Sequence, residues 1–193
     1  GRTVSHNLGV APEMMWVKAR NASVYSWIVQ GTAIEAGKRL ELNETYALST
    51  TFGGVSNLTS TSFDLGNWNN VNGNTTTYVA YLFASLPGIS KVGSYTGNGG
   101  TSVSGLTQDI DCGFTSGARF VLIKATNAGD HWFLYDSLRG IVAGNDSTLK
   151  LNTTDAEQTN SDEIDPLNSG FTVVNRNNQL NRTGREYIFY AIA

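Results

Sequence analysis

The chain has 193 residues, of which 15% are charged and 40% are hydrophobic, and its formal net charge at pH 7 is −3. Gly, Thr, Asn and Ser together account for 78 residues, and these types favour turns and strands over helix interiors. This composition excludes a helical bundle. The weak negative charge argues against a surface that binds nucleic-acid phosphates, and no apolar run reaches the roughly 18 residues that a membrane span needs.

Short apolar segments follow one another along the chain, each bounded by Gly, Asn, Ser or Thr, and this pattern is typical of β-strands. In the first half of the chain these segments are 14–18, 25–28, 40–43, 63–65 and 78–84. In the second half they are 120–124, 131–134, 149–152, 171–173 and 187–193. We therefore expect an all-β fold, with short helical turns only at 34–39 and 155–158.

The two sets of segments match in order and in spacing. Lys18 and Lys124 are 106 residues apart, and Tyr78 and Tyr187 are 109 residues apart. A drift of only three residues indicates a duplicated β unit with small loop insertions. The sequence thus predicts a single β-sandwich domain over 1–193, of jelly-roll type, made of pseudo-repeats 6–84 and 111–193. The segment 85–110 is expected to link them.

The segments 77–84 and 186–193 are almost continuously apolar. Strands with apolar residues on both faces are usually covered on both sides or lie in the centre of a sheet. Both segments are therefore expected to be strands covered on both faces, or at least central strands of a sheet.

Residues that could support catalysis or metal binding are few. His6 and His131 have no metal-ligand spacing with another His, Cys or carboxylate, so we expect His6 to order a turn and His131 to lie at a strand edge. Cys112 has no second cysteine to pair with and is expected in the core. No Gly-x-Ser-x-Gly elbow and no phosphate-binding loop occurs. No catalytic residue, metal or cofactor is expected.

Paired carboxylates are the enzymatic alternative, because two carboxyl groups perform glycoside hydrolysis. Asp109 and Asp111 alternate with Ile110, which places both carboxylates on one face of a strand. Asp162, Glu163 and Asp165 form an acidic turn whose oxygens could hold Ca²⁺. The simpler interpretation of both groups is a solvated strand edge and a solvated turn.

The loop 66–74 combines one Trp with several Asn residues. An indole face suits a sugar ring, and Asn amides both donate and accept hydrogen bonds to hydroxyl groups. Trp68, Asn69, Asn70 and Asn72 are therefore the candidate glycan-binding residues. The alternative is that Trp68 folds back onto the sheet or packs on a neighbouring subunit, since the equivalent loop 175–181 has no Trp.

Several segments together resemble a known family. They are the stretch from Ser5 to Lys18, Tyr78 to Gly88, Lys91 to Gly99 and Trp132 to Gly140. The sequence is similar to a domain of unknown function found in virion proteins of tailed bacteriophages, and the resemblance runs from His6 to Ala193. It implies a concanavalin A-like β-sandwich and a virion setting, and it supplies no catalytic residues.

Composition and resemblance lead to one functional expectation. We expect a non-enzymatic virion protein, a tail-fibre or capsid decoration module on the particle surface, that binds host-surface glycan or assembles with other virion subunits, including copies of itself. No nucleic-acid partner and no membrane insertion are expected. The alternatives are a polysaccharide-degrading enzyme on a β-sandwich and a purely structural interaction module.

Overall fold

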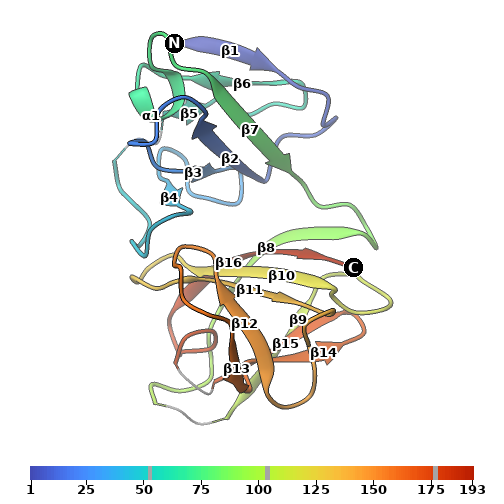
Figure 1. Ribbon diagram of the computed structural model, residues 1–193. Helices are drawn as coiled ribbons and strands as arrows, with labels where there is room; N and C mark the ends of the chain where they lie inside the picture. The colour runs from blue at the N-terminus through green and yellow to red at the C-terminus, as the bar shows by residue number, and fades with distance from the viewer. Residues whose placement is uncertain (52–53, 103–104, 176–177) are drawn as a thin grey trace. The chain divides into compact units, whose positions relative to one another are not determined.

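The computed structural model describes residues 1–51, 54–102, 105–175 and 178–193. The chain is built almost entirely from antiparallel β-sheets and divides into two compact units, Gly1–Ala84 (unit 1) and Ser85–Ala193 (unit 2) (Figure 1). The expected all-β sandwich class is confirmed.

Unit 1 consists of two small antiparallel sheets and one short helix. The larger sheet has the strand order β4-β3-β2-β7 and the smaller one the order β1-β6-β5. The element bounds are β1 (Arg2–Ser5), β2 (Met14–Ala19), β3 (Ile28–Gln30), β4 (Leu40–Glu41), β5 (Val55–Ser56), β6 (Ser62–Leu65), α1 (Asn69–Asn72) and β7 (Tyr78–Phe83).

Apolar side chains between these two sheets form the core of unit 1. Met15 and Val17 alternate along β2, so both point to the same face, where they meet Phe63 of β6 in one buried cluster. Val71 of α1 is fully buried in the same cluster. The helix therefore contributes Val71 to the core between the two sheets.

Unit 2 repeats this arrangement with additional strands. Its larger sheet has the order β13-β12-β11-β10-β16-β8 and its smaller sheet the order β14-β15-β9. The bounds are β8 (Ser90–Thr96), β9 (Thr107–Asp111), β10 (Phe120–Ala125), β11 (Trp132–Asp136), β12 (Asp146–Lys150), β13 (Gln158–Ser161), β14 (Ile164–Leu167), β15 (Gly170–Val174) and β16 (Glu186–Ile192).

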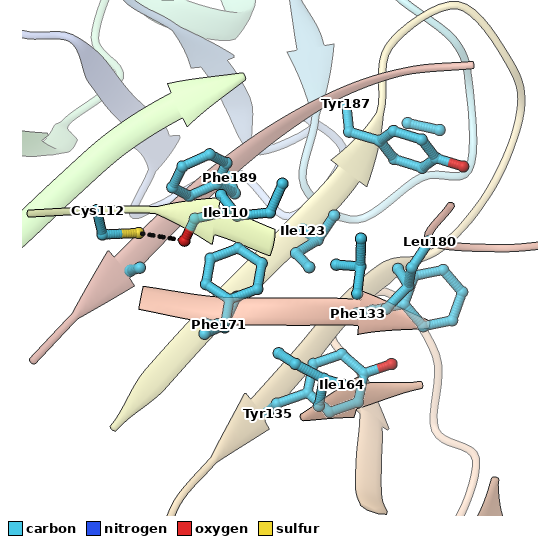
Figure 2. Packing of buried hydrophobic residues seen from close by; sticks show 14 of the residues in the cluster. Ile110, Cys112, Ile123, Phe133, Tyr135, Ile164, Phe171, Leu180, Tyr187 and Phe189 are labelled. Atoms are coloured by element: carbon cyan, nitrogen blue, oxygen red, sulfur yellow. Dashed lines mark hydrogen bonds between the residues drawn. The ribbon is translucent and has the colours of Figure 1, made fainter. Parts of the chain in front are cut away.

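Aromatic rings dominate the core of unit 2, which Figure 2 shows from close by. Phe171 of β15 meets Phe189 of β16 edge to face, with ring centroids 5.3 Å apart and an interplanar angle of 85°. This is a favourable arrangement for two ring quadrupoles. Both rings are at most 2% exposed, so this contact joins the two sheets of the unit.

The strand registers of the two units correspond residue by residue. Met14 pairs with Phe83 in unit 1, and Phe120 pairs with Ile192 in unit 2, which reproduces the sequence offsets of 106 and 109. The smaller sheets correspond as well, since Val4 pairs with Phe63 and Ile110 with Phe171. Each copy of the repeat forms its own pair of sheets.

The segment 85–110, expected to link the repeats, contains strand β8 and most of β9, and both belong to sheets of unit 2. As expected, β16 is a central strand, between β10 and β8. The same expectation was wrong for β7, which is the last strand of its sheet. The apolar sequence pattern cannot distinguish β7 from β16, because both strands are apolar. They differ in pairing, since only β16 has a second neighbouring strand among the described residues.

The expected helical turns are also wrong. Residues 34–38 form turns and bends, and Arg39 forms an isolated β-bridge with Ser49. In place of the helical turn expected at 155–158, residues 155–157 are irregular and Gln158 begins β13. The described helix is α1, within the Asn-rich loop. Pro166 lies inside β14, which is possible because β14 is the edge strand of its sheet.

We predict that Phe171→Ala lowers the free energy of unfolding by about 3–5 kcal/mol, since it removes a fully buried ring and leaves a cavity. Urea unfolding followed by circular dichroism measures the change. Leu138→Ala, at a side chain that is 90% exposed, is the matched control and should stay within about 0.5 kcal/mol of the wild type. Equal effects of the two substitutions would contradict the described core.

Candidate functional site

A cleft of about 830 Å³ opens between the two sheets of unit 1. Its walls come from β1 and β6 of the smaller sheet, from β2 and β7 of the larger sheet, and from the segment after α1. The lining residues are Arg2, Val4, Val17, Arg20, Phe63, Leu65, Val71, Asn72, Gly73, Asn74, Thr75, Thr76, Thr77, Tyr78 and Ala80. We call this the unit 1 cleft.

The unit 1 cleft has an apolar floor and a polar rim. The floor includes Val17, Phe63 and Val71, which are at most 2% exposed. Amides, hydroxyls and the exposed guanidinium groups of Arg2 and Arg20 form the rim. Among the described residues that line the cleft there is no carboxylate, histidine or cysteine. Such a surface offers apolar contact, hydrogen bonds and positive charge.

Hydrogen bonds hold the rim in place. The Tyr78 hydroxyl accepts a hydrogen bond from the Gly73 amide at 2.7 Å and donates one to the Asn69 carbonyl at 2.5 Å. Asn21, just beyond β2, donates to the Thr75 carbonyl and accepts from the Thr77 amide. The rim is thus tied to both strands of the larger sheet that border the cleft.

The four expected glycan-binding residues are not grouped on one surface. Trp68 is half-buried, packs against the core cluster of unit 1 and lies under Arg39, whose guanidinium carbon is 4.6 Å from the ring centroid. Asn69 is exposed, and Asn70 accepts a hydrogen bond from the Ser26 amide. The indole therefore takes part in the packing of unit 1.

Asn72 alone of these four residues lines the unit 1 cleft. Its Nδ2 donates to the Gly66 carbonyl at 3.0 Å. Arg2 and Arg20, which also line the unit 1 cleft, were not among the expected residues, because both are distant from the loop in sequence. The run of Asn and Thr residues at 74–77 is the signal that could have extended the search.

The carboxylates of Asp109 and Asp111 lie on the exposed face of β9, as their alternation with the buried Ile110 predicts. Asp109 accepts a hydrogen bond from the Thr172 hydroxyl at 2.6 Å, and Asp111 accepts one from the Gly113 amide. They line a shallower space of about 390 Å³ between β8 and β9. Both carboxylates thus stabilise local structure.

The acidic segment 162–165 turns partly into the core. Glu163 is 3% exposed and accepts a hydrogen bond from the Tyr135 hydroxyl. Asp146, 1% exposed, accepts hydrogen bonds from the Glu163 and Ile164 amides, each at 2.8 Å. Burial raises the pKa of Asp146 to about 6, although these backbone donors act in the opposite direction. No group of three or more potential His, Cys, Asp or Glu metal ligands occurs among the described residues.

His6 and Cys112 occupy structural positions. His6 Nδ1 accepts a hydrogen bond from the Leu8 amide and orders the turn, as expected. Burial, followed by the nearby Asp111 charge, raises the pKa of the Cys112 thiol to about 12. Cys112 is 6% exposed, so this thiol lacks the thiolate character of a reactive cysteine.

Lys124 is a buried cation in the centre of unit 2. It is 0% exposed, and its Nζ donates to the Ala125 carbonyl at 2.7 Å. Burial lowers the pKa of Lys124 to about 8, an effect that the Asp130 carboxylate opposes and the Arg185 guanidinium reinforces. Its repeat counterpart, Lys18, also donates to a backbone carbonyl, that of Tyr25.

The architecture defines a class, an all-β sandwich protein with two repeated antiparallel units. The chain belongs to the family described as Domain of unknown function (DUF7483), which matches residues 1–193. Comparison with curated proteins and with solved structures finds no match in either group. In the described part of the chain, no helix is long and apolar enough to cross a membrane.

We predict that the free energy of unfolding rises with pH above 8 because of Lys124. Its pKa is lower in the folded state, so the unfolded state binds more protons between pH 8 and about 10.5, and raising the pH favours folding. The gain from pH 8 to 9 should be about 1 kcal/mol. Urea unfolding at several pH values measures it.

Lys124→Met should remove this pH-dependent gain, and Lys18→Met, at the equivalent position of unit 1, should keep it. The same pH dependence in the Lys124→Met protein as in the wild type would show that the titrating group is not Lys124.

Proposed function

We propose that this chain is a non-enzymatic structural protein of a tailed-bacteriophage virion, a tail-fibre or capsid decoration module exposed on the particle surface. The resemblance of its segments to virion proteins, noted above, supports this setting. The antiparallel sandwich is compatible with a jelly-roll, concanavalin A-like ancestry, which belongs to the same proposal.

The composition of the unit 1 cleft is the observation that carries the proposal of binding rather than catalysis. Its described lining residues provide an apolar floor, neutral hydrogen-bonding groups and two guanidinium groups, and none of them is a carboxylate, histidine or cysteine. Catalysis of acyl or glycosyl transfer needs a nucleophile or a general acid and base near the substrate. A partner held in this cleft would be bound and left unchanged.

Assembly with other virion subunits is the form of binding that the cleft supports best. The cleft lies beside β7, the last strand of its sheet. Ala80 of this strand is exposed and Tyr81 is 45% exposed. An apolar strand at a sheet edge is a template for pairing with another chain. This observation favours a protein partner, either a copy of the same chain or another subunit.

We predict that the chain is a stable component of purified phage particles. Mass spectrometry of gradient-purified particles should find it at a constant ratio to the major capsid protein, and antibodies against it should label intact particles. A replication protein of the same phage is the negative control. Recovery of the chain only in the soluble lysate would contradict the virion proposal.

Host-surface glycan binding is the second candidate function, favoured by the Asn and Thr groups of the rim. These groups are neutral, they both donate and accept hydrogen bonds, and Asn74, Thr75 and Thr77 are exposed. Arg2 and Arg20 would add affinity for an acidic sugar. The loop that carries Trp68, Asn69, Asn70 and Asn72 leads directly into this rim.

For the glycan-binding function, we predict that a glycan array shows binding of the chain to host polysaccharide. Asn74→Ala should weaken this binding without lowering the melting temperature. Trp68→Ala should lower the melting temperature, because Trp68 packs against the core cluster of unit 1. Asn168→Ala, at an exposed turn of unit 2, is the control for the general loss of a surface amide. Equal binding by all variants would contradict the proposal of glycan binding.

The same incubation tests the enzymatic alternative. Release of reducing ends from the polysaccharide, abolished by Asp109→Asn, would overturn the proposal of a non-enzymatic protein.

A further inference from the structure

A small pocket lies at β4, the last strand of the larger sheet of unit 1 (Figure 1). It has a volume of about 300 Å³, and its lining residues are Arg39, Glu41, Tyr46, Ala47 and Ser49. The chain closes this pocket on itself, since Arg39, next to β4, forms a β-bridge with Ser49. We call it the β4 pocket. It shares no described lining residue with the unit 1 cleft.

Two opposite charges stand side by side in the β4 pocket. Arg39 Nε donates to Glu41 Oε1 at 3.2 Å, and the two side chains are only 14% and 16% exposed. Arg39 Nη1 also donates to the Thr51 carbonyl at 2.9 Å. These bonds use two of the five N–H groups of a guanidinium, and a carboxylate oxygen accepts more than one hydrogen bond. The pair can therefore both donate to a ligand and accept from it, and it adds no net charge to the pocket.

The indole of Trp68 holds the arginine of this pair in place. The Arg39 guanidinium carbon lies 4.6 Å from the centroid of the Trp68 ring, which is a cation–π contact. Trp68 itself packs against the core cluster of unit 1, and Gly54 makes room for it, because a Cβ on Gly54 would lie 3.1 Å from Trp68 Cε3. Three groups thus fix the planar head of Arg39, and a guanidinium that is already fixed loses little conformational entropy when a ligand binds.

Tyr46 gives the pocket an exposed aromatic wall. Its side chain is 64% exposed and lines the same space as the ion pair. Ser49 adds a hydroxyl group, whose oxygen accepts a hydrogen bond from the Thr51 amide at 3.2 Å and whose proton is a donor. An aromatic face beside neighbouring donors and acceptors matches a sugar ring, which presents C–H groups on its face and hydroxyls around its edge. The volume of about 300 Å³ corresponds to one such ring.

The second repeat keeps the strand pairing of this region but has different side chains there. Thr148 pairs with Gln158 across β12 and β13, and this pair corresponds to the β-bridge of Arg39 by an offset of 109. Thr148 takes the place of the arginine and is buried. Lys150, at the position of the carboxylate, forms an ion pair with Asp155, at the position of the aromatic ring, over 3.5 Å. The guanidinium and the aromatic wall are therefore specific to unit 1, and strand pairing does not require them.

We propose that the β4 pocket binds one neutral pyranose unit of a host-surface glycan. Tyr46 stacks on the C–H face of the sugar ring, while Arg39 donates to one hydroxyl and Glu41 accepts from its neighbour. Trp68 does not line the pocket and is a positioning residue, because it holds Arg39. This inference rests on the proposed glycan-binding function and adds to it a binding site and a class of ligand.

The experiment titrates the full ¹⁵N-labelled chain with the methyl glycosides of glucose, galactose, mannose and N-acetylglucosamine and follows the backbone amides by two-dimensional NMR. At least one glycoside should bind, with a Kd of about 1 mM for a ligand of this size. The largest chemical-shift changes should fall within residues 39–49. Cyclohexanol, an apolar ring with a single hydroxyl, is the control ligand and should bind at least about tenfold more weakly.

Tyr46→Ala and Glu41→Gln test the two halves of the site. Tyr46 is largely exposed, so its replacement leaves the fold intact, and the loss of ring stacking should weaken binding at least about fivefold. Glu41→Gln keeps the shape of the acceptor and removes its charge, which should weaken binding by about the same factor. Asp155→Ala, at the position of unit 2 that corresponds to Tyr46, is the matched control and should change the Kd less than about twofold.

Trp68→Phe and Trp68→Leu separate positioning from packing. Both substitutions shrink a side chain of the core cluster and lower the melting temperature, but only phenylalanine keeps an aromatic face against Arg39. Trp68→Leu should therefore bind the sugar at least about threefold more weakly than Trp68→Phe. Equal affinities of the two variants would overturn the positioning role.

The location of the shifts separates this inference from the glycan-binding function on which it rests. Shifts confined to residues 72–78, with unchanged affinity of Tyr46→Ala, would place the sugar at the unit 1 cleft and overturn the β4 pocket alone. If none of the four glycosides binds, the β4 pocket is refuted, and the glycan array decides separately whether the chain binds glycans.

Discussion

A β-strand has two hydrogen-bonding edges. The last strands of the two repeats, β7 and β16, differ in how many of these edges pair with another described strand. In unit 2, β16 uses both edges, for β10 and β8. Its residues Tyr187, Ile188 and Phe189 are consequently at most 2% exposed. In unit 1, β7 uses one edge, and the residue corresponding to Phe189 is an exposed alanine. The cleft and the exposed apolar residues of unit 1 lie at this strand.

The two repeats share a cross-strand hydrogen bond although the residues at the two positions differ. In unit 1, the Thr3 hydroxyl of β1 donates to the Asp64 carboxylate of β6 at 2.6 Å. In unit 2, the Thr172 hydroxyl of β15 donates to Asp109 of β9, also at 2.6 Å. The threonine and the aspartate have exchanged strands, and the cross-strand hydrogen bond is the same. Such a pair ties the two strands of a small sheet together on its outer face.

Much of this architecture follows from the sequence, because strand identity depends on local alternation and turn residues. The offsets that relate Lys18 to Lys124 and Tyr78 to Tyr187 correspond to the observed registers of β2, β7, β10 and β16. Position within a sheet is different, since it depends on whether another strand is present. The segments of β7 and β16 are equally apolar, and only the structure shows that β8 pairs with one of them.

The candidate site was harder to predict for a related reason. Trp68 lies in a loop whose composition is typical of a sugar-binding loop. Arg39 and the core cluster of unit 1, however, occupy the faces of the indole ring. Arg2 lies in β1 and Arg20 follows β2, and both line the same cleft as Asn72 only because the unit folds. A site made from side chains of five segments leaves no compact motif in the sequence.

Part of the polar composition of the chain lies beside the edge of β7. Edge strands in soluble proteins usually carry a lysine, a proline or a bulge that prevents pairing with other chains. The residues of β7, from Tyr78 to Phe83, include none of these. The surrounding rim, by contrast, is rich in Asn and Thr. The Tyr78 hydroxyl holds it by accepting a hydrogen bond from the Gly73 amide, and Asn21 by donating one to the Thr75 carbonyl. The edge of β7 therefore combines an apolar strand that no lysine, proline or bulge protects with an ordered rim of Asn, Thr and Arg side chains.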